Sequence, residues 1–199
     1  MQAGKSNTFA QFAQMGIPYI GLNAPSNCLR RTSPALRQAY EQAGLLDTLD
    51  ERGRQELTFY LRLGQYPELF PTIMDVEVPM VTGVAQAMLA AERGPHVAIS
   101  WAYMHLLVGE LPINHVFFLR PNKRVWHRRL RGRALAMGLP RHGHISDGVI
   151  QQIAHSTRMD PDFIEQMLLA TGVPMTMIDS SGQDQGGLVV RRTIESLVR

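Results

Sequence analysis

His96-Val97-Ala98-Ile99-Ser100-Trp101 and Asn114-His115-Val116-Phe117-Phe118-Leu119 are the stretches of sequence that decide the fold. Each is a short run that is apolar on both faces. The second one ends at Arg120-Pro121-Asn122, a turn-forming sequence. Runs of this kind are typical of central parallel strands that helices cover on both sides. The sequence therefore predicts an α/β fold with a mainly parallel sheet.

Strands and helices are predicted to alternate along the rest of the chain. Ile17–Leu22 and Met175–Ile178 are further short apolar runs with the composition of strands. The predicted helices are 7–15, one from Pro34, about 50–64, one from about Pro79 to Gly94, one after Asn122, about 147–156, about 161–171 and a final one containing Leu188 to Val198. We predict that residues 1–199 form a single domain.

Gly4-Lys5-Ser6 matches the second half of a phosphate-binding loop. Such loops read G-x-x-x-x-G-K followed by Ser or Thr, and they follow a buried strand. Only Met1-Gln2-Ala3 precede the match, so the first glycine and the strand are missing from it. Asn7 to Met15 have helical periodicity and end at Gly16. The pattern predicts a phosphate site at a helix N-terminus, where free N–H groups and the helix dipole favour anions.

The positive charge of the chain is concentrated in one segment. The net charge is +3, and residues 120–133 contain seven basic residues and no acid. A cluster of this kind suits an anionic ligand such as nucleic acid or the phosphates of a nucleotide, although a solvated helix face has the same composition. Nucleic acid is the less favoured partner, because Trp126 is the only aromatic residue within the cluster. The basic residues are Arg120, Lys123, Arg124, Arg128, Arg129, Arg131 and Arg133.

The composition predicts a cytoplasmic protein. Cys28 is the only cysteine, which excludes an intrachain disulfide and any metal site built from several cysteines, and this fits a reducing compartment. No uninterrupted apolar run of about 18 residues and no signal-peptide pattern is present, so no membrane partner is expected. Nothing in the sequence specifies an oligomeric state.

Three groups of residues outside these patterns have two interpretations each. Asp75 and Glu77 are either a substitute base or magnesium partner, or, as is more common, a solvated pair at a helix start. His142 and His144 are either a weak metal site or ordinary loop residues. Trp101, at the end of a central strand, either lines a substrate pocket or packs in the core.

The order of these motifs resembles that of P-loop nucleotide and cofactor kinases. Gly4-Lys5-Ser6 with its helix, followed by Gly16-Ile17-Pro18-Tyr19-Ile20, is similar to their phosphate loop, first helix and second strand. Arg129-Leu130-Arg131-Gly132-Arg133 is similar to their R-L-x-x-R helix, which leads into the lid. Met177-Ile178-Asp179-Ser180-Ser181-Gly182 is similar to their closing I-D-N-S-G segment, which lies beside the adenine.

Within this superfamily the greatest likeness is to dephospho-coenzyme A kinase. Leu49-Asp50-Glu51-Arg52 resembles its L-D-R segment, Glu77-Val78-Pro79-Met80-Val81 its H-P-x-V segment, and Ile150 to His155 the helix after its lid. The likeness covers nearly the whole chain. It implies a P-loop kinase-like three-layer sandwich with a mainly parallel sheet, N-terminally truncated so that the first strand is missing. It also implies a mobile, Arg-bearing lid at about residues 134–148.

The resemblance further implies ATP-dependent phosphoryl transfer to a small-molecule acceptor, with ATP and Mg²⁺ as cofactors and a place in coenzyme A biosynthesis. The alternatives are a nucleoside or deoxynucleoside monophosphate kinase and a catalytically impaired nucleotide-binding relative. The implied site residues are Lys5, Arg129 and Arg133 (catalytic), Gly4, Lys5, Ser6, Asn7 and Arg141 (ATP phosphates), Ser6 (Mg²⁺), Asp179, Ser181 and Gly182 (adenine side), and Asn23 and Trp101 (acceptor side).

Three positions depart from the family pattern. Asn23 occupies the position of the acidic residue after the second strand, which the resemblance would make the catalytic base, and Gly21 replaces the other acid. Val78 stands where the family has histidine before Pro79. An amide cannot take a proton from an attacking hydroxyl as a carboxylate does. Because positioning and charge neutralisation do most of the work in phosphoryl transfer, the loss of the base need not abolish activity.

Overall fold

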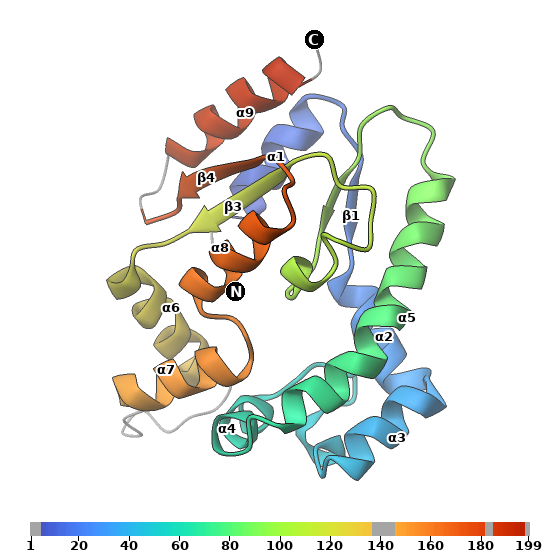
Figure 1. Ribbon diagram of the computed structural model, residues 1–199, viewed down its shortest axis with the longest axis vertical. Coiled ribbons are helices and arrows are strands. Elements are labelled where there is room, and N and C mark those ends of the chain that lie inside the picture. The colour runs from blue at the N-terminus through green and yellow to red at the C-terminus, as the bar shows by residue number, and fades with distance from the viewer. Residues whose placement is uncertain (1–4, 137–145, 182–184, 198–199) are drawn as a thin grey trace.

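The computed structural model describes residues 5–136, 146–181 and 185–197 (Figure 1). The chain has a mixed α/β fold that is about 60% helix, with two small parallel sheets. The first half contains α1 (Lys5–Gln14), β1 (Tyr19–Gly21), α2 (Asn23–Thr32), α3 (Pro34–Gln42), the 3₁₀ turn η1 (Leu46–Thr48), α4 (Leu57–Gln65) and α5 (Leu69–Ala91). The second half contains β2 (Ala98–Ser100), η2 (Met104–Leu106), β3 (Val116–Arg120), α6 (Lys123–Ala136), α7 (Asp147–Ser156), α8 (Pro161–Ala170), β4 (Met175–Asp179) and α9 (Gln185–Leu197).

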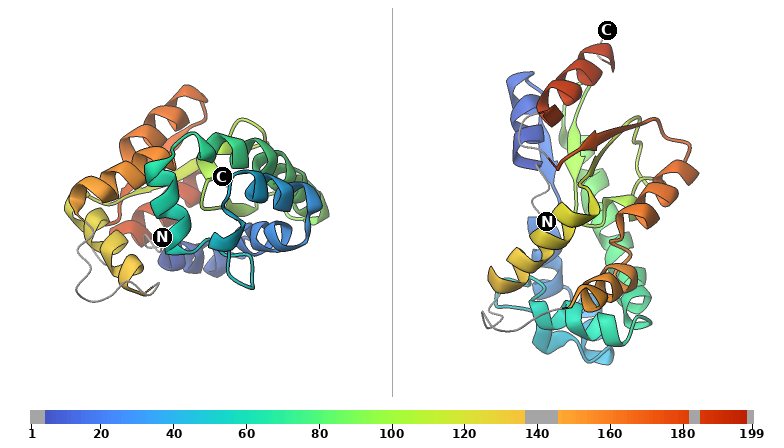
Figure 2. Two further views of the ribbon diagram at one scale, coloured as in Figure 1. Left: turned by 90° about the horizontal axis from the view of Figure 1, so that it is seen from below. Right: turned by 90° about the vertical axis from the view of Figure 1, so that its left-hand side faces the viewer.

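The strands form two parallel pairs. β1 pairs with β2 so that Ile20 lies opposite Ile99, and β3 pairs with β4 so that Phe118 lies opposite Met177. All four predicted strands are therefore confirmed, and the mainly parallel pairing is confirmed with them. In the described part of the chain the pairs do not join into one sheet. In Figure 2, α1 and α9 lie on one side of the strands and α8 lies on the other.

The predicted helix over 50–64 is wrong in its first half. The carboxylate of Asp50 accepts hydrogen bonds from the backbone N–H groups of Arg52 (2.9 Å) and Arg54 (2.8 Å). Gly53 has a φ of +74°, so these residues form a tight loop closed by a bridge between Leu49 and Gln55. A helix forms only after this loop, as α4.

The predicted helix start near Pro79 is also wrong, because Pro79 lies inside the 23-residue α5. An internal proline costs about 3 kcal/mol through its lost N–H and its steric clash. Buried side chains on both sides of it offset this cost: Ile73 precedes Pro79 on the core side, and Val81 and Ala85 follow it. Tertiary packing here overrides the local preference of proline.

Two larger apolar cores hold the fold together. The first lies among helices α2, α3, α4 and α5 and the segment that follows β2. Its fully buried members include Tyr40, Phe59 and Leu107. The second joins α1 and α9 to the strands through Phe12, Ile178, Val190 and other residues. The helix α5 is long and apolar enough to cross a membrane by length and composition alone, a test that core helices of soluble proteins also pass. Here it contributes buried side chains to the first core.

Gly53 cannot be replaced without distorting the fold. A Cβ atom at this residue would lie 2.1 Å from the backbone oxygen of Asn27, and the φ of +74° disfavours any side chain. We therefore expect Gly53→Ala to lower the free energy of unfolding by more than about 2 kcal/mol, since the left-handed conformation alone costs roughly 1–2 kcal/mol. Urea unfolding measures this difference.

Gly44→Ala is the matched control, because Gly44 has a similar φ of +64° but open space around it. This variant should lose only about 1 kcal/mol, the conformational cost. Equal losses in the two variants would show that Gly53 does not touch α2 as the structure has it.

Candidate functional site

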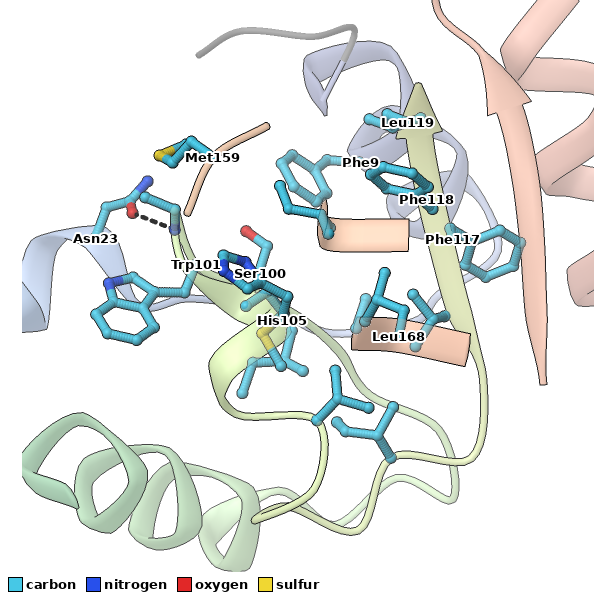
Figure 3. Close-up of a pocket in the computed structure, with 18 of the residues that line it drawn as sticks. Phe9, Asn23, Ser100, Trp101, His105, Phe117, Phe118, Leu119, Met159 and Leu168 are labelled. Atoms are coloured by element: carbon cyan, nitrogen blue, oxygen red, sulfur yellow. Dashed lines mark hydrogen bonds between the residues drawn. The ribbon is translucent and has the colours of Figure 1, made fainter. Parts of the chain in front are cut away.

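A cavity of about 950 Å³ lies between the two strand pairs (Figure 3). Consecutive residues 95–102, which include β2, form one wall, and 112–119, which include most of β3, form another. Phe9 and Phe12 of α1 and Leu168 of α8 also line it. The volume is near the upper end of the range of about 300–1,000 Å³ that is usual for ligand pockets. This cavity is the candidate site.

The structure brings the two predicted acceptor-side residues together at one end of the cavity. Asn23 is the first residue of α2, two positions after β1, and Trp101 follows β2 directly. The side-chain Oδ1 of Asn23 accepts a hydrogen bond from the backbone N–H of Ala102 (3.2 Å), which is drawn in Figure 3. Trp101 lines the cavity but is only 2% exposed and packs edge-on against Tyr103. Trp101 therefore both lines the cavity and packs in the core, the two roles that the sequence left open.

The predicted adenine-side residues lie at the carboxyl end of β4. The hydroxyl of Ser181 accepts a hydrogen bond from the backbone N–H of Asn122 (2.6 Å), which ties the end of β4 to the start of α6. The Asp179 carboxylate accepts a hydrogen bond from the N–H of Ser181 (2.8 Å), and hydrogen bonding by Ser181 lowers the pKa of Asp179. Gly182 lies outside the described residues.

The residues predicted to bind phosphate fall partly within the described chain. Lys5, Ser6 and Asn7 are the first three described residues of α1, and the prediction that Gly-Lys-Ser forms a phosphate site at a helix N-terminus stays a prediction. The helix is followed by Gly16 with a φ of +69°, as predicted. Arg129 and Arg133 both lie in α6, one turn apart. Gly4, Arg141 and most of the predicted lid at 134–148 lie outside the described residues.

Arg120, at the start of the basic cluster, has acidic partners. Arg120 forms ion pairs with Asp162 and Glu165, both on α8. These contacts pin the end of β3 to α8. Arg120 therefore contributes to the packing of these elements, a role that differs from both interpretations of the cluster, an anion-binding segment and a solvated helix face.

The sequence did not reveal a buried polar network beside the cavity. Glu77 is fully buried in α5 and receives hydrogen bonds from Arg30 Nη2 (2.5 Å), Arg30 Nε (3.1 Å) and Ser26 Oγ (2.6 Å). The hydroxyl of Tyr40 donates to the same carboxylate (3.4 Å) and accepts from Gln55 Nε2 (2.9 Å). The interpretation of Glu77 as part of a solvated helix start is wrong, since it lies in the middle of α5. The signal in the sequence that could have indicated burial is the position of Glu77 within a long and mostly apolar helix.

The network also extends toward the cavity. Tyr103 donates a hydrogen bond to Gln55 Oε1 (3.2 Å), and burial raises the pKa of Tyr103 well above its ordinary range, so the phenol stays neutral. Arg30 and Gln55 are themselves cavity-lining residues. The polar network thus forms part of the cavity wall.

His105 is a second buried polar residue that lines the cavity. It is 5% exposed, and within the described residues its Nε2 atom has no hydrogen-bond partner. Burial, with a smaller effect of Arg158, lowers the pKa of His105 to about 4. The ring is therefore neutral near pH 7 and presents an unpaired polar atom.

No metal centre is evident in the described part of the chain, where no three His, Cys, Asp or Glu side chains come together. His142 and His144, the weak metal candidates, lie outside it.

Comparisons with known proteins identify no relative. No family model, no curated protein and no solved structure matches this chain. The functional inference below therefore depends on the residues of the chain itself.

The Glu77–Arg30 pair gives a prediction of stability. Glu77→Ala leaves the buried Arg30 guanidinium unpaired, so we expect a loss of about 3–5 kcal/mol in the free energy of unfolding. Asp75→Ala, an exposed acid two residues away in the same helix, should change it by less than about 0.5 kcal/mol. Chemical denaturation of both variants provides the comparison, and similar losses would mean that Glu77 does not neutralise Arg30.

His105 gives a prediction of pH dependence. Its pKa is about 4 in the folded chain and about 6.5 when unfolded, so between these values only the unfolded chain binds the proton. Stability is therefore lost as the pH falls from about 6.5 to about 4, by up to about 1.4 kcal/mol per pH unit from this group. His105→Gln should remove this part of the slope when unfolding is measured across the window.

His155→Gln, which alters an exposed histidine in α7, is the control and should leave the slope unchanged. If His105→Gln follows the wild-type curve at every pH, the imidazole is not held neutral by burial.

Proposed function

We propose that this protein binds Mg²⁺·ATP and transfers its γ-phosphoryl group to a small-molecule acceptor, as a divergent member of the P-loop cofactor kinases. The acceptor most in keeping with the sequence motifs is dephospho-coenzyme A. The fold in this proposal is a P-loop kinase-like sandwich in which the two parallel pairs belong to one interrupted sheet.

The observation that carries the proposal is the start of α1 at Lys5. In a ten-residue helix whose described residues begin with Lys5, Ser6 and Asn7, the first turn has backbone N–H groups without intrahelical partners and a positive dipole end, and its sequence supplies a lysine and a serine. Phosphate and Mg²⁺ are the ligands that this combination suits. The location of Asn23, Trp101 and Ser181 just after strand ends supports it, since ligands of parallel α/β sheets gather at the carboxyl ends of strands.

The proposed reaction needs few groups from the protein. The acceptor hydroxyl attacks the γ-phosphorus, the bond from that phosphorus to the bridging oxygen breaks, ADP leaves, and the hydroxyl proton passes to solvent or to the transferred phosphate. Lys5 neutralises the β and γ phosphates, Ser6 helps to hold Mg²⁺, and Arg129 and Arg133 stabilise the charge on the phosphoryl group in flight. Asp179 and Ser181 border the adenine in this proposal, and Asn23 and Trp101 border the acceptor.

A second candidate is a nucleotide-binding protein without transferase activity. The specific observation in its favour is the contact of Asn23 with Ala102. Asn23 stands where the resemblance places a catalytic base, yet its amide oxygen serves to fix the end of β2 and cannot accept a proton at neutral pH. Binding of ATP without turnover would follow from such a site.

Calorimetric titration with Mg²⁺·ATP tests the binding that both candidates share. We expect wild-type protein to bind, and Lys5→Ala to weaken binding at least about tenfold, since a hydrogen bond to a charged group contributes roughly 1.5–3 kcal/mol. Arg37→Ala, which removes an exposed charge from α3, is the charge-matched control and should bind as wild type does. Absence of binding at millimolar ATP would refute both candidates.

Product analysis then separates the two. Incubation with ATP and either dephospho-coenzyme A or a nucleoside monophosphate should give ADP and a phosphorylated acceptor if the protein is a kinase. Binding with no acceptor-dependent ADP would leave the nucleotide-binding protein as the function.

A further inference from the structure

One edge of β2 carries backbone groups that have no partner. Ala98 donates its N–H to Pro18 (2.8 Å) on the β1 side, and Ser100 accepts from the N–H of Leu22 (2.9 Å) on the same side. Backbone groups alternate along a parallel ladder, so the intervening Ile99 points its N–H and C=O to the opposite edge. Within the described chain no hydrogen bond uses them.

The edge of β3 that faces away from β4 is open in the same way. Val116 donates its N–H to Pro174 (2.9 Å), the residue just before β4, so Val116 faces β4. By the same alternation Phe117 and Leu119 point their N–H and C=O groups to the other edge. No described residue bonds to them there.

Both open edges face the cavity. Side chains alternate between the two faces of a strand, so a cavity that touches only one face is lined by every second residue. Here consecutive residues line it along both strands, 95–102 and 112–119. The cavity therefore meets β2 and β3 along their edges, and Figure 3 shows the two strands on either side of it. Hydrogen-bond donors and acceptors thus border the cavity on two opposite sides.

The two faces of the cavity are apolar. Phe12 of α1 packs edge-on against Phe117, with ring centroids 5.8 Å apart, and Ile194 of α9 lines the same side. Ile164 and Leu168 line the cavity from α8, which lies on the other side of the strands (Figure 2). A molecule held between β2 and β3 would meet apolar side chains on its faces and peptide groups along its edges.

The charged and titratable groups of the described lining favour a neutral ligand. The two arginines among them, Arg30 and Arg54, are each paired with a carboxylate. Burial lowers the pKa of His105 to about 4 and also lowers the pKa of His115, so both imidazoles are neutral near pH 7. Since a charge is costly to bury without a partner, an uncharged molecule suits this space better than an ion.

We propose that the cavity binds a neutral, flat heteroaromatic lactam whose ring N–H and C=O groups hydrogen-bond to the open edges of β2 and β3. A flat ring system has apolar faces and a polar rim, which is the pattern of the cavity walls. Its lactam groups place a donor beside an acceptor, as the free peptide groups of the strands do. This binding goes beyond the proposed phosphoryl transfer, which uses the first turn of α1.

A small molecule fits this place better than a strand of another chain. Helices α1 and α9 cover one face and α8 covers the other (Figure 2). The segment that connects β2 to β3 lines the cavity as well, through Met104, Val108 and Ile113. A second polypeptide would have to thread between these elements, whereas a small neutral molecule needs only a local opening.

Titration with lumichrome, a neutral and fluorescent tricyclic lactam, tests the proposal. Its 1,3-dimethyl derivative is the matched control, because it keeps the flat rings and the carbonyl groups but has no ring N–H. We expect the wild-type chain to bind lumichrome with a change in its fluorescence. The dimethyl derivative should bind at least about tenfold more weakly, because it would leave backbone carbonyls buried without donors.

Hydrogen exchange locates the bound ring. Lumichrome should slow exchange at least about tenfold at the amides of Ile99 and Phe117, which point into the cavity. The amides of Ser100 and Phe118, which already face β1 and β4, should change much less.

Leu168→Trp and Leu169→Trp are paired variants for the same test. Leu168 lines the cavity and is 4% exposed, whereas its neighbour Leu169 is 61% exposed. Leu168→Trp should occupy part of the cavity and weaken lumichrome binding at least about tenfold, and Leu169→Trp should bind as the wild type does. The exchange pattern of the wild-type chain decides the question if Leu168→Trp does not fold.

Four outcomes would overturn the proposal. Absence of lumichrome binding, with Mg²⁺·ATP still bound, would remove this site and leave the proposed function standing. Equal affinity for the dimethyl derivative would show an apolar cavity whose strand edges bind nothing. Displacement of lumichrome by Mg²⁺·ATP would place the ring in the nucleotide site. Protection of the Ile99 and Phe117 amides by a free apolar hexapeptide, and not by lumichrome, would assign the open edges to a polypeptide partner.

Discussion

The buried carboxylate of Glu77 is the interaction on which the helical half of this protein depends. A charge in the interior of a domain is tolerated only when its partners are fixed around it, and Glu77 obtains them from α2 through Ser26 and Arg30 and from α3 through Tyr40. Gln55 extends the network to the loop before α4. One carboxylate therefore sets how α2, α3 and this loop are placed on α5. An all-apolar interface of these helices could slide, whereas this one has a single satisfied arrangement.

The hydrogen-bond network around Glu77 also forms part of the wall of the cavity between the two strand pairs. Arg30 and Gln55 take part in the network and line the cavity, and Tyr103 reaches Gln55 from the segment that follows β2. The position of β2 is thus fixed on one edge by β1 and at its end by the network and by Asn23. At the other wall, Arg120 holds the end of β3 to α8 through two acidic residues. The two walls are anchored independently, which allows them to stand apart with a cavity between them.

Periodicity and apolar runs predicted much of this fold, because they report local preferences. The strands around Ile20, Ile99, Phe118 and Ile178 were located, as were the helix that follows Gly4-Lys5-Ser6 and the parallel pairing. The errors arose where distant contacts override local ones: core packing carries α5 through Pro79, and the Asp50 carboxylate stabilises a loop in place of a helix turn. The Glu77 network was missed because its members come from several elements, and the burial of His105 was missed because residues distant in the sequence surround it. The sequence alone also does not specify the gap between β2 and β3.

The contact between Asn23 and Ala102 limits the chemistry available at the carboxyl ends of the strands. The amide oxygen of Asn23 is engaged by a backbone N–H, and its nitrogen can only donate. A carboxylate there could accept the same backbone hydrogen bond with one oxygen and take a proton with the other. The amide of Asn23 therefore accepts the backbone hydrogen bond as a carboxylate would, but it has no second oxygen that could take a proton. Phosphoryl transfer of the kind proposed above would therefore depend on positioning and charge neutralisation, the tasks that the proposal assigns to the first turn of α1 and to the arginines of α6. The orientation of α1 is in turn fixed by its packing across the gap, on Tyr19 of one strand pair and Phe117 of the other. Whatever sets the spacing of the two pairs therefore also sets the position of α1.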